Sequence, residues 1–563
     1  MPTIQIPVGT SNFTEIIREH YYFIDKSGLI EELLKTQSTK VTLITRPRRF
    51  GKSLGMSMLN EFFDIRKDSR DLFAGLTIAD NINLCKAWMN QYPTLFLTFK
   101  DVGGNTFENA YGLLETVIAN AFNAHEYLLQ SNRVNANDQS AFLRLSAGNA
   151  RKKELQTSIA LLIRMLYAHY GKPVILLLDE YDVPIAKASG NNGLKTDYYD
   201  QMMEVLYPLI STAIKDNEYL KFAVITGCLK IAKESIFTGT NNFVSDTITD
   251  TRLNEFFGFT QEEVNQLLAD TGLYSHALEI KEWYDGYYFG HVNVYCPWDV
   301  MNHVKNLTLN PVKKPVSYWK NSSDNTIIRS FIDHTGPAVT RKFETLMAGK
   351  WITEKIEDNL TYRDLYSSES NLWSVLYLTG YLTQYHTDTP DMGLPQGYLA
   401  LTIPNKEIME IFESTVKTWF EQSTRHWDRK ALFTAVWAGD SDSITSEMTK
   451  LLRKTISYHD YKEDFYHAFF AGIFAGAGYI VESNREHGEG RSDIVIQDYA
   501  RDRVAVFEVK YSKSQEDLIK DCTKALTQMD IRMYAEEFEE EYSNVICYGI
   551  SFYKKRCMVQ IKE

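Results

Sequence analysis

Cysteine is scarce in this chain, and its few cysteines form no pattern. The 563 residues include six cysteines, and no two of them make a Cys-x-x-Cys pair. The spacing therefore gives no support to a disulfide framework or a zinc site. Because disulfides persist mainly in oxidising compartments, the simplest expectation is a protein of the reducing cytoplasm.

Long apolar runs are missing as well. No stretch approaches the roughly 20 apolar residues that are needed to span a bilayer. The start, from Met1 to Gln5, lacks the basic segment and the apolar stretch of a secretory signal. These absences predict a protein with no membrane partner. The chain also has no internal repeat and no low-complexity tract, which disfavours repeat architectures.

Positive charge is in deficit. The 60 basic and 73 acidic residues give a formal net charge of −13, which argues against a protein that coats nucleic acid with its whole surface. It does not exclude a nuclease, because a local cleft with bound metal can hold a phosphate backbone on an acidic protein. Disorder is disfavoured over most of the length, since the chain is rich in aromatic residues, with 34 tyrosines and 30 phenylalanines.

Apolar runs in the first half predict an α/β domain. Strands are expected where short apolar runs occur, and helical stretches separate these runs. This alternation is typical of a parallel sheet with helices on both faces. The predicted strands are 41–44, 94–99, 174–178 and 221–226.

The predicted secondary structure changes twice along the rest of the chain. Amphipathic helical patterns dominate the middle, and residues 307–316 are typical of a connector. The last part returns to α/β, in the order helix, three strands, helix and two strands. At this length two or three domains are expected. We predict a P-loop domain at 1–290, a mostly helical module at 291–450 and a small α/β domain at 451–563.

The segment after the first predicted strand contains the parts of a phosphate loop, which are a tight turn, a lysine, a hydroxyl and a helix start. Gly51 would let the backbone approach the phosphates, Lys52 would reach the β- and γ-phosphates of ATP, and Ser53 would ligate Mg²⁺. The usual first glycine is absent, because Arg46 occupies its position. Three further loop residues are assigned to the nucleotide site, with pairing to local carboxylates as the alternative for the arginines: Arg48, Arg49 and Phe50.

A later apolar run ends in two carboxylates. Asp179 would hold the Mg²⁺ shell, and Glu180 would orient or deprotonate the attacking water. Thr226, at the end of the next run, is at the position of a sensor of the γ-phosphate or only caps its strand. Lys230 and Arg252 would stabilise charge, with a solvated surface role as the alternative. In this order along the chain, these residues predict ATP binding and hydrolysis.

A second cluster is expected near the C-terminus. Strand geometry places Glu508 and Lys510 on one face of a predicted strand. Asp493 reaches the same place if the preceding strand pairs beside it. Two carboxylates and an amine then converge, and hard oxygen ligands suit Mg²⁺ or Mn²⁺. Such a metal would activate a water against a phosphodiester, with Lys510 positioning that water. A solvated strand face is the alternative for Glu-x-Lys alone.

Two flanking helices offer further groups. Glu463, on a helix predicted at 461–475, would supply another carboxylate to the metal. Tyr466 and His467 would line the cleft, although a core position for His467 is an equal alternative. Gln528, on a helix predicted at 515–538, would orient the substrate or a metal-bound water.

These motifs resemble two known families. The first half resembles the family described as AAA-ATPase-like, in which an Arg-Pro-Arg-Arg-Phe-Gly-Lys loop is typical, so the absent glycine no longer counts against a phosphate loop. The last part resembles the PD-(D/E)xK nuclease superfamily, with Ser492 where many members have proline. The matching segments of the first family are Tyr22 to Ser27, Arg46 to Ser53, Leu178 to Asp182, Ile231 to Phe237, Trp283 to Tyr287 and Tyr295 to Trp298, and the core motif of the second is Asp493, Glu508 and Lys510.

The two resemblances together imply an ATP-regulated, metal-dependent nuclease. Its substrate would be DNA rather than RNA, because that superfamily mostly cuts DNA. A role in defence against phage or mobile elements is an association only. Two alternatives are open: a nuclease fold that binds nucleic acid or protein without cutting, and a signalling ATPase with no nucleic-acid partner. The oligomeric state is open, and a homo-oligomer is one expectation, because ATPases that donate an arginine between subunits are often multimeric.

Overall fold

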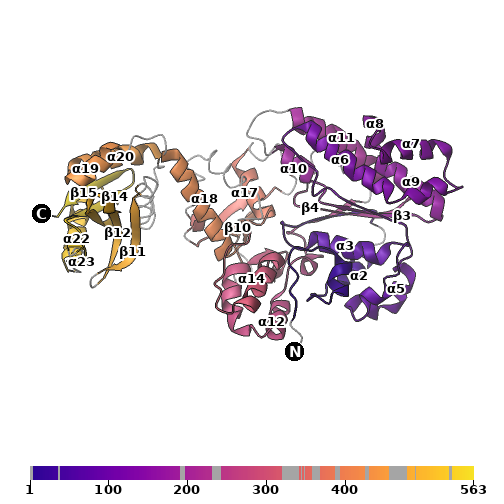
Figure 1. Ribbon diagram of the computed structural model, residues 1–563, viewed down its shortest axis with the longest axis horizontal. Coiled ribbons are helices and arrows are strands. Elements are labelled where there is room, and N and C mark those ends of the chain that lie inside the picture. The colour runs from indigo at the N-terminus through magenta and orange to yellow at the C-terminus, as the bar shows by residue number, and fades with distance from the viewer. Residues whose placement is uncertain are drawn as a thin grey trace. The chain divides into compact units, whose positions relative to one another are not determined.

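The computed structural model of the protein is shown in Figure 1. Its residues fall into two compact units, 1–327 with 349–411 and 328–348 with 412–563. No helix of the described residues combines the length and apolarity required to cross a membrane. The structure describes residues 4–35, 39–189, 197–230, 243–319, 342–343, 345–347, 349–357, 360, 368–386, 393–424, 430–455, 474, 479–487, 490–531, 536–539 and 541–562.

The first unit is built on a five-stranded parallel sheet in the order β2-β3-β4-β1-β5. Every residue of β1 and β3 is buried, which explains the apolar run Val174 to Leu178 in β3 and the mostly apolar sequence of β1. The predicted parallel sheet is therefore confirmed. It has one strand more than expected, because β5 is short and half-exposed and gives little apolar signal. The strands are β1 (Val41–Thr45), β2 (Thr94–Thr98), β3 (Val174–Asp179), β4 (Leu220–Gly227) and β5 (Phe243–Asp246).

Helices cover both faces of this sheet, as Figure 1 shows. Helices α2, α3 and α5 pack an apolar core against Ile44, Ile175 and Val224 on one face. Helices α6, α9 and α11 lie on the other face, against β2, β3 and β4. The bounds of these helices are α2 (Gly28–Lys35), α3 (Lys52–Phe63), α5 (Ile82–Trp88), α6 (Phe107–Asn123), α9 (Ser158–Tyr170) and α11 (Asp197–Ile214), with α1 (Phe13–Arg18), α4 (Arg70–Phe73), α7 (Ala136–Ser146), α8 (Lys152–Gln156) and α10 (Val183–Ser189) around them.

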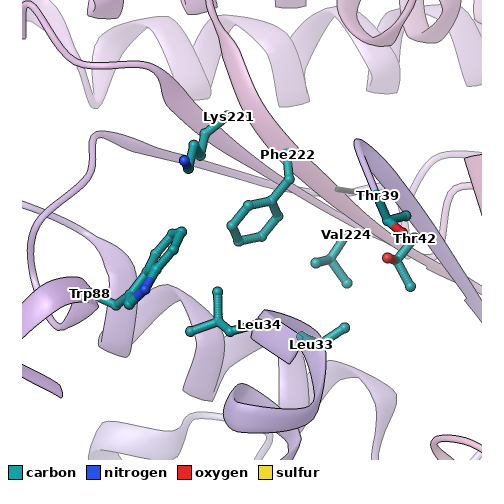
Figure 2. A pocket seen from close by; sticks show the side chains of 8 residues that line it. All are labelled: Leu33, Leu34, Thr39, Thr42, Trp88, Lys221, Phe222 and Val224. Carbon is teal, nitrogen blue, oxygen red and sulfur yellow. The ribbon is translucent and has the colours of Figure 1, made fainter. Parts of the chain in front are cut away.

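A small hollow lies between the sheet and helices α2 and α5 (Figure 2). Phe222 and Trp88 line it, and the Lys221 ammonium lies over the Trp88 ring at 5.2 Å from the centroid. Its volume is about 10 Å³, at the lower limit for one water molecule. The lining residue Thr42 stands near the amino end of β1. Ligands of parallel sheets bind at the carboxyl ends of the strands, so this hollow is not the nucleotide site.

The remainder of the first unit contains helices and two small antiparallel sheets. The sheet β8-β10-β9 lies inside the predicted helical module and was not expected, because its strands have two to five residues. Helix α14 continues to Leu309, so the predicted connector begins inside it. The elements are α12 (Gln261–Asp270), α13 (Ala277–Tyr284), β6 (Tyr287–Phe289), β7 (Val292–Val294), α14 (Pro297–Leu309), β8 (Ile352–Lys355), α17 (Glu369–Leu378), β9 (Thr383–Gln384), β10 (Tyr398–Thr402) and the start of α18 (Lys406–Thr424).

The second unit contains a five-stranded mixed sheet in the order β11-β12-β13-β14-β15. Only the β13–β14 pair is parallel, and helix α22 connects these two strands. Helices α19 and α20 pack on one face of the sheet, and α22 covers the other. The elements are α19 (Lys430–Ala438), α20 (Ser441–Thr455), β11 (Ile480–His487), β12 (Gly490–Asp498), β13 (Arg503–Tyr511), α22 (Leu518–Ile531), α23 (Glu536–Glu539), β14 (Asn544–Tyr553) and β15 (Arg556–Ile561).

This order of three strands, a helix and two strands agrees with the predicted α/β domain. The long helix expected at 515–538 corresponds to two elements, since α22 ends at Ile531 and α23 is separate. The expected leading helix at 461–475 lies outside the described residues except for Phe474. The predicted boundary at 450 falls within α20, which packs against the sheet of the second unit.

Candidate nucleotide and nuclease sites

The phosphate loop connects β1 to α3, and two of its residues are left-handed. Arg49 has φ 72° and Gly51 has φ 82°, a region that glycine adopts freely and other residues rarely. A Cβ added at Gly51 would meet no atom within 4 Å, so the loop backbone faces open space there. Helix α3 begins at the next residue, Lys52. An open backbone at a helix start is a favourable place for an anion.

The Lys52 side chain folds back onto the phosphate loop and bonds to its backbone. It is only 4% exposed, and its Nζ donates to the carbonyl oxygens of Arg46 at 2.9 Å and Pro47 at 2.8 Å. The Sγ atom of Cys228 lies 3.8 Å from the same Nζ. The ammonium charge is thereby fixed inside the loop rather than free in solvent.

Asp179 lies at the carboxyl end of β3 and is 1% exposed. Its Oδ2 accepts a hydrogen bond of 2.7 Å from the Ser53 hydroxyl and one of 3.4 Å from Thr98. Its Oδ1 accepts from the Thr226 hydroxyl at 2.6 Å. The structure thus brings together three predicted residues, and it adds Thr98, which the strand-end position of β2 beside β3 would have indicated.

This donor set fits Mg²⁺. Ser53 and Asp179 present a hydroxyl and a carboxylate oxygen 2.7 Å apart. Neighbouring ligands of an octahedral Mg²⁺ shell are about 2.9 Å apart when the metal–oxygen distance is near 2.1 Å, so the observed spacing is suitable. Both groups are hard oxygen donors, and both lie at the start of α3 or at the adjacent strand end.

Glu180 follows Asp179 in a left-handed conformation with φ 53°. Burial raises the pKa of its carboxyl, and the nearby Lys52 charge opposes this rise. The charges of Asp179 and Asp182 raise the pKa further, whereas Arg48 lowers it. A carboxylate whose pKa moves toward neutrality accepts a proton more effectively, which is the property that a general base requires.

Arg46, at the position of the absent glycine, is an anchor. It is fully buried, and its Nη2 donates to Asp246 Oδ1 at 2.6 Å and to Asn254 Oδ1 at 2.9 Å. Its Nη1 donates to the carbonyl oxygens of Thr45 and Asp246. The phosphate loop is thereby tied to β5. No local sequence pattern marks this anchoring role, because the side-chain partners of Arg46 lie 200 or more residues away.

The outer side chains of the loop contact residues 287–298. The Arg49 guanidinium lies 4.1 Å from the centroid of the Trp298 ring, and the Phe50 ring is buried against Tyr287 and Phe289. The structure therefore gives Arg49 and Phe50 a packing partner. Arg48 is exposed, and its charge acts on Glu180 as described above.

The two residues that follow Glu180, which are Tyr181 and Asp182, hold the segment at the end of β4 in place. Asp182 accepts hydrogen bonds from the backbone N–H groups of Cys228 at 2.9 Å and Leu229 at 3.0 Å. The Tyr181 hydroxyl donates to the Leu229 carbonyl at 2.9 Å. A Cβ at Gly227 would lie 2.7 Å from both side chains, so only glycine permits this approach. These contacts fix the segment that follows Thr226.

Arg252 and Lys230 were predicted to stabilise charge at the nucleotide site, and the structure gives side-chain contacts for Arg252. Arg252 donates to the Glu32 carbonyl at 2.8 Å, and its Nε lies 3.5 Å from the Glu32 carboxylate, so it is held beside α2. Lys230 is half-buried just after the segment that Asp182 holds. The motif at 231–237 lies outside the described residues.

A buried carboxyl pair lies behind the phosphate loop. Asp299 and Glu407 face each other, and Glu407 Oε1 accepts from the N–H groups of Tyr318 and Trp319. Burial raises the pKa of Asp299 from 3.8 to about 6, with the Arg49 charge opposing the rise. Burial and the Asp299 charge raise the pKa of Glu407 well above its ordinary value. Two carboxyls in this position share a proton rather than both ionising.

The C-terminal cluster lies on β12 and β13. The register pairs Ile494 with Phe507, which places the preceding residue Asp493 opposite Glu508. The Oδ2 atom of Asp493 accepts a hydrogen bond of 2.8 Å from the N–H of Val509. The aspartate is therefore held between the two other predicted residues of the cluster.

Glu508 and Lys510 point to the same face of the sheet. Phe507 and Val509 belong to the core under α19 and α20, so the alternate residues face α22. The Lys510 Nζ lies 2.9 Å from Glu508 Oε1, and Glu508 is fully buried while Lys510 is half-buried. The structure therefore brings Asp493, Glu508 and Lys510 together.

Two carboxylates suit a divalent metal, but the described part of the cluster is smaller than predicted. Among the described residues no group of three or more His, Cys, Asp or Glu side chains is arranged to hold a metal. The other predicted members, Glu463, Tyr466 and His467, lie outside the described residues. Gln528 is on α22, where it lines an open hollow with Lys524 and Thr527. The hard oxygen atoms of Asp493 and Glu508 fit Mg²⁺ or Mn²⁺ as a partial ligand set.

Comparisons with known proteins find a family match at each end of the chain. Residues 7–237 match the family described as predicted AAA-ATPase, and residues 461–562 match the PD-(D/E)XK nuclease superfamily. The chain is also 25% identical over 559 residues to an uncharacterized protein in the vnfD 5′ region of Azotobacter chroococcum mcd 1, an alignment that covers 97% of this chain and 96% of the other. The chain therefore combines a domain of the predicted AAA-ATPase family with a C-terminal domain of the PD-(D/E)XK nuclease superfamily.

Proposed function

We propose that this protein hydrolyses ATP at the phosphate loop, cuts DNA at the C-terminal cluster with a divalent metal, and uses the nucleotide to regulate the cutting. The observation that carries the proposal is the presence of two assembled polar clusters in one chain. One is centred on Asp179 and the other on Glu508.

At the phosphate loop, the residues have separable tasks. Lys52 places a fixed positive charge beside the open backbone at Gly51, where the β- and γ-phosphates would bind. Ser53 and Asp179 would hold Mg²⁺, which spreads the charge of the transferring phosphoryl group. Glu180 accepts the proton of the attacking water, and Thr226 keeps Asp179 oriented through a bond of 2.6 Å.

At the C-terminal cluster, Asp493 and Glu508 would hold Mg²⁺ or Mn²⁺. A metal bound there polarises a phosphodiester and lowers the pKa of a water. Lys510, which is held by Glu508, places its ammonium beside the attacking water and stabilises the developing negative charge. DNA is the proposed substrate, and regulation would follow if nucleotide binding favours one arrangement of the chain over another.

The test is cutting of plasmid and linear DNA by the full-length protein with Mg²⁺ or Mn²⁺, with and without ATP. We expect cutting that requires the metal and changes in rate when ATP is added. Lys510→Ala should lower the cutting rate about 10²-fold or more, as the loss of one charge-stabilising donor does elsewhere. The matched control is Arg501→Ala, which removes an exposed cation from the connection between β12 and β13. Equal cutting by Lys510→Ala and wild type would reject the assigned site.

A second candidate is a switch ATPase whose nuclease fold binds nucleic acid without cutting. The observation that favours it is the pairing of Glu508 with Lys510 at 2.9 Å, which engages one of the two carboxylate oxygens that could hold a metal. DNA binding that is unchanged by EDTA, with no cutting under any metal, would select this candidate.

Two broader roles complete the proposal. We place the protein in the bacterial cytoplasm, with phage or mobile-element DNA as the target. A strain that carries the gene should then form fewer phage plaques than one with Lys510→Ala. Equal plaque numbers would reject the defence role without affecting the enzymatic one.

A further inference from the structure

Basic residues gather at one end of the sheet in the second unit. Three follow one another where β14 turns into β15: Lys554 and Lys555 form the turn, and Arg556 is the first residue of β15. Lys513 follows β13, and Lys520 lies on the first turn of α22. Arg556, Lys513 and Lys520 are exposed, and the other two are half-buried. We call these five residues the basic rim.

The strand register places the basic rim at the end of the sheet that carries Lys510. Strands β13 and β14 are parallel, and Lys510 of β13 lies opposite Ser551 of β14. Strand β14 ends two residues later, at Tyr553, where the chain reverses into β15. The Ser551 hydroxyl donates to the carbonyl of Leu518, the first residue of α22. The end of β13, the turn after β14 and the start of α22 therefore lie together.

Arg556 also shares a sheet face with Glu508. Phe552 and Cys557 belong to the core under α19 and α20, so their strand neighbours Tyr553 and Arg556 point to the α22 face. This is the face onto which Glu508 and Lys510 point. By strand spacing, Arg556 lies roughly 10 Å across the sheet from β13 and roughly 7 Å farther along it than the level of Lys510.

Three acidic residues, Glu516, Asp517 and Asp521, lie near the five basic residues of the rim, and two of the three have partners. Asp521 pairs with Lys524 at 2.6 Å, and Asp517 accepts from the Ser514 hydroxyl at 2.7 Å. The local excess of positive charge is thus opposite in sign to the chain, whose formal net charge is −13. Concentrated positive charge beside a cluster that is suited to phosphodiester chemistry is complementary to a polyanion.

We propose that the basic rim binds the sugar-phosphate backbone of duplex DNA next to Asp493, Glu508 and Lys510. The assignment of DNA as the occupant rests on the proposed nuclease function. Contacts to phosphates position a duplex without reading its sequence, so this end of the sheet gives affinity and orientation rather than base specificity. A duplex rises about 3.4 Å per base pair, so the rim and the cluster contact phosphates a few nucleotides apart.

The test is binding of the full-length protein to a fluorescent 30-base-pair duplex in EDTA, which prevents cutting, over a series of salt concentrations. The variant is Lys555→Ala with Arg556→Ala. We expect the slope of log K against log salt to fall by about two, and Kd at 0.1 M salt to rise at least about tenfold. The matched control is Arg501→Ala with Lys562→Ala, which removes two cations at the opposite end of the sheet.

Two measurements guard against misfolding. Each variant should keep the thermal unfolding midpoint and the ATP hydrolysis rate of the wild type.

A single Lys513→Ala substitution, in an exposed loop, should lower the salt slope by about one. Rim and control variants that weaken binding equally, or a rim variant that binds as tightly as wild type, would overturn the proposal.

The outcomes also separate this proposal from the proposed function. Rim-dependent DNA binding without metal-dependent cutting supports the rim and rejects the nuclease. Metal-dependent cutting with DNA binding that ignores the rim rejects the rim alone.

Discussion

At the nucleotide site, side chains from the start of α3, from β2 and from β4 converge on Asp179 of β3, whereas the described members of the C-terminal cluster come from two neighbouring strands. The first site exists only when segments far apart in sequence are assembled into one parallel sheet. The second follows from the pairing of β12 with β13 and from strand alternation. The first site therefore depends on the whole fold, and the second on one hairpin-like pair.

The largest expected effect tests whether the two sites are chemically separate. Glu180→Gln removes the proton acceptor and should lower ATP hydrolysis about 10²–10⁴-fold, with nucleotide binding retained. Metal-dependent cutting without ATP should keep its wild-type rate. Hydrolysis and nucleotide equilibrium binding are the measurements. A loss of ATP-free cutting in this variant would contradict the separation.

The next prediction tests the dependence of the phosphate loop on a distant anchor. Arg46→Gly would give the loop its usual first glycine, yet it would leave the buried Asp246 without its ion-pair partner at 2.6 Å. Breaking a buried pair in this way costs about 3–5 kcal/mol of unfolding free energy. Chemical denaturation measures it, with exposed Arg48→Gly as the control. A variant that is as stable as wild type would show that the anchor is unnecessary.

A paired comparison then contrasts the two acids directly. Lys510→Ala removes the ammonium 2.9 Å from the buried Glu508, and we expect a loss of about 2–3 kcal/mol in unfolding free energy. Ser53→Ala removes one of several hydroxyls around Asp179 and should cost about 1 kcal/mol. Denaturant titration of both variants gives the two values. A larger loss in Ser53→Ala than in Lys510→Ala would mean that Asp179 depends more on a single partner than Glu508 does.

The last prediction has an effect that varies with pH, and it concerns the carboxyl pair behind the phosphate loop, an acid pair without the adjacent lysine that Glu508 has. The folded-state pKa of Asp299, about 6, is above its ordinary value of 3.8. The folded protein therefore binds the proton more tightly, and stability is lost as pH rises from about 4 through about 6.

Glu407→Gln should remove much of this loss. The amide oxygen can still accept from Tyr318 and Trp319, and we expect about 1–3 kcal/mol of added stability at pH 8 that fades toward pH 4. Unfolding at several pH values is the measurement, with Glu410→Gln on the same helix as the control. A gain that is the same at every pH would contradict proton sharing.

Parts of the nucleotide site and of the C-terminal cluster could be predicted from the sequence, and the physical reason differs between the two sites. The buried strands β1 and β3 are rich in apolar residues, so the Gly-Lys-Ser motif and Asp179 could each be placed at the carboxyl end of a predicted strand. The face shared by Glu508 and Lys510 follows from the two-residue period of a strand. The roles of these residues were inferred from their chemistry, as a phosphate-binding amine, a metal-binding carboxylate pair and a charge-stabilising lysine, and the family resemblance supported them.

Other features were not predictable because they depend on long-range packing. The anchor between Arg46 and Asp246 joins residues 200 positions apart, and no local pattern marks it. The stacking of Arg49 on Trp298 and the buried Glu407 have the same origin. The short strand β5 was missed because two of its four residues, Ser245 and Asp246, are polar.

The closed conformation of Lys52 has a kinetic consequence. Its ammonium already binds the carbonyl oxygens of Arg46 and Pro47, so the loop does not have to order itself when a nucleotide arrives. Association should then proceed in one step, with a rate proportional to nucleotide concentration and no slow isomerisation phase.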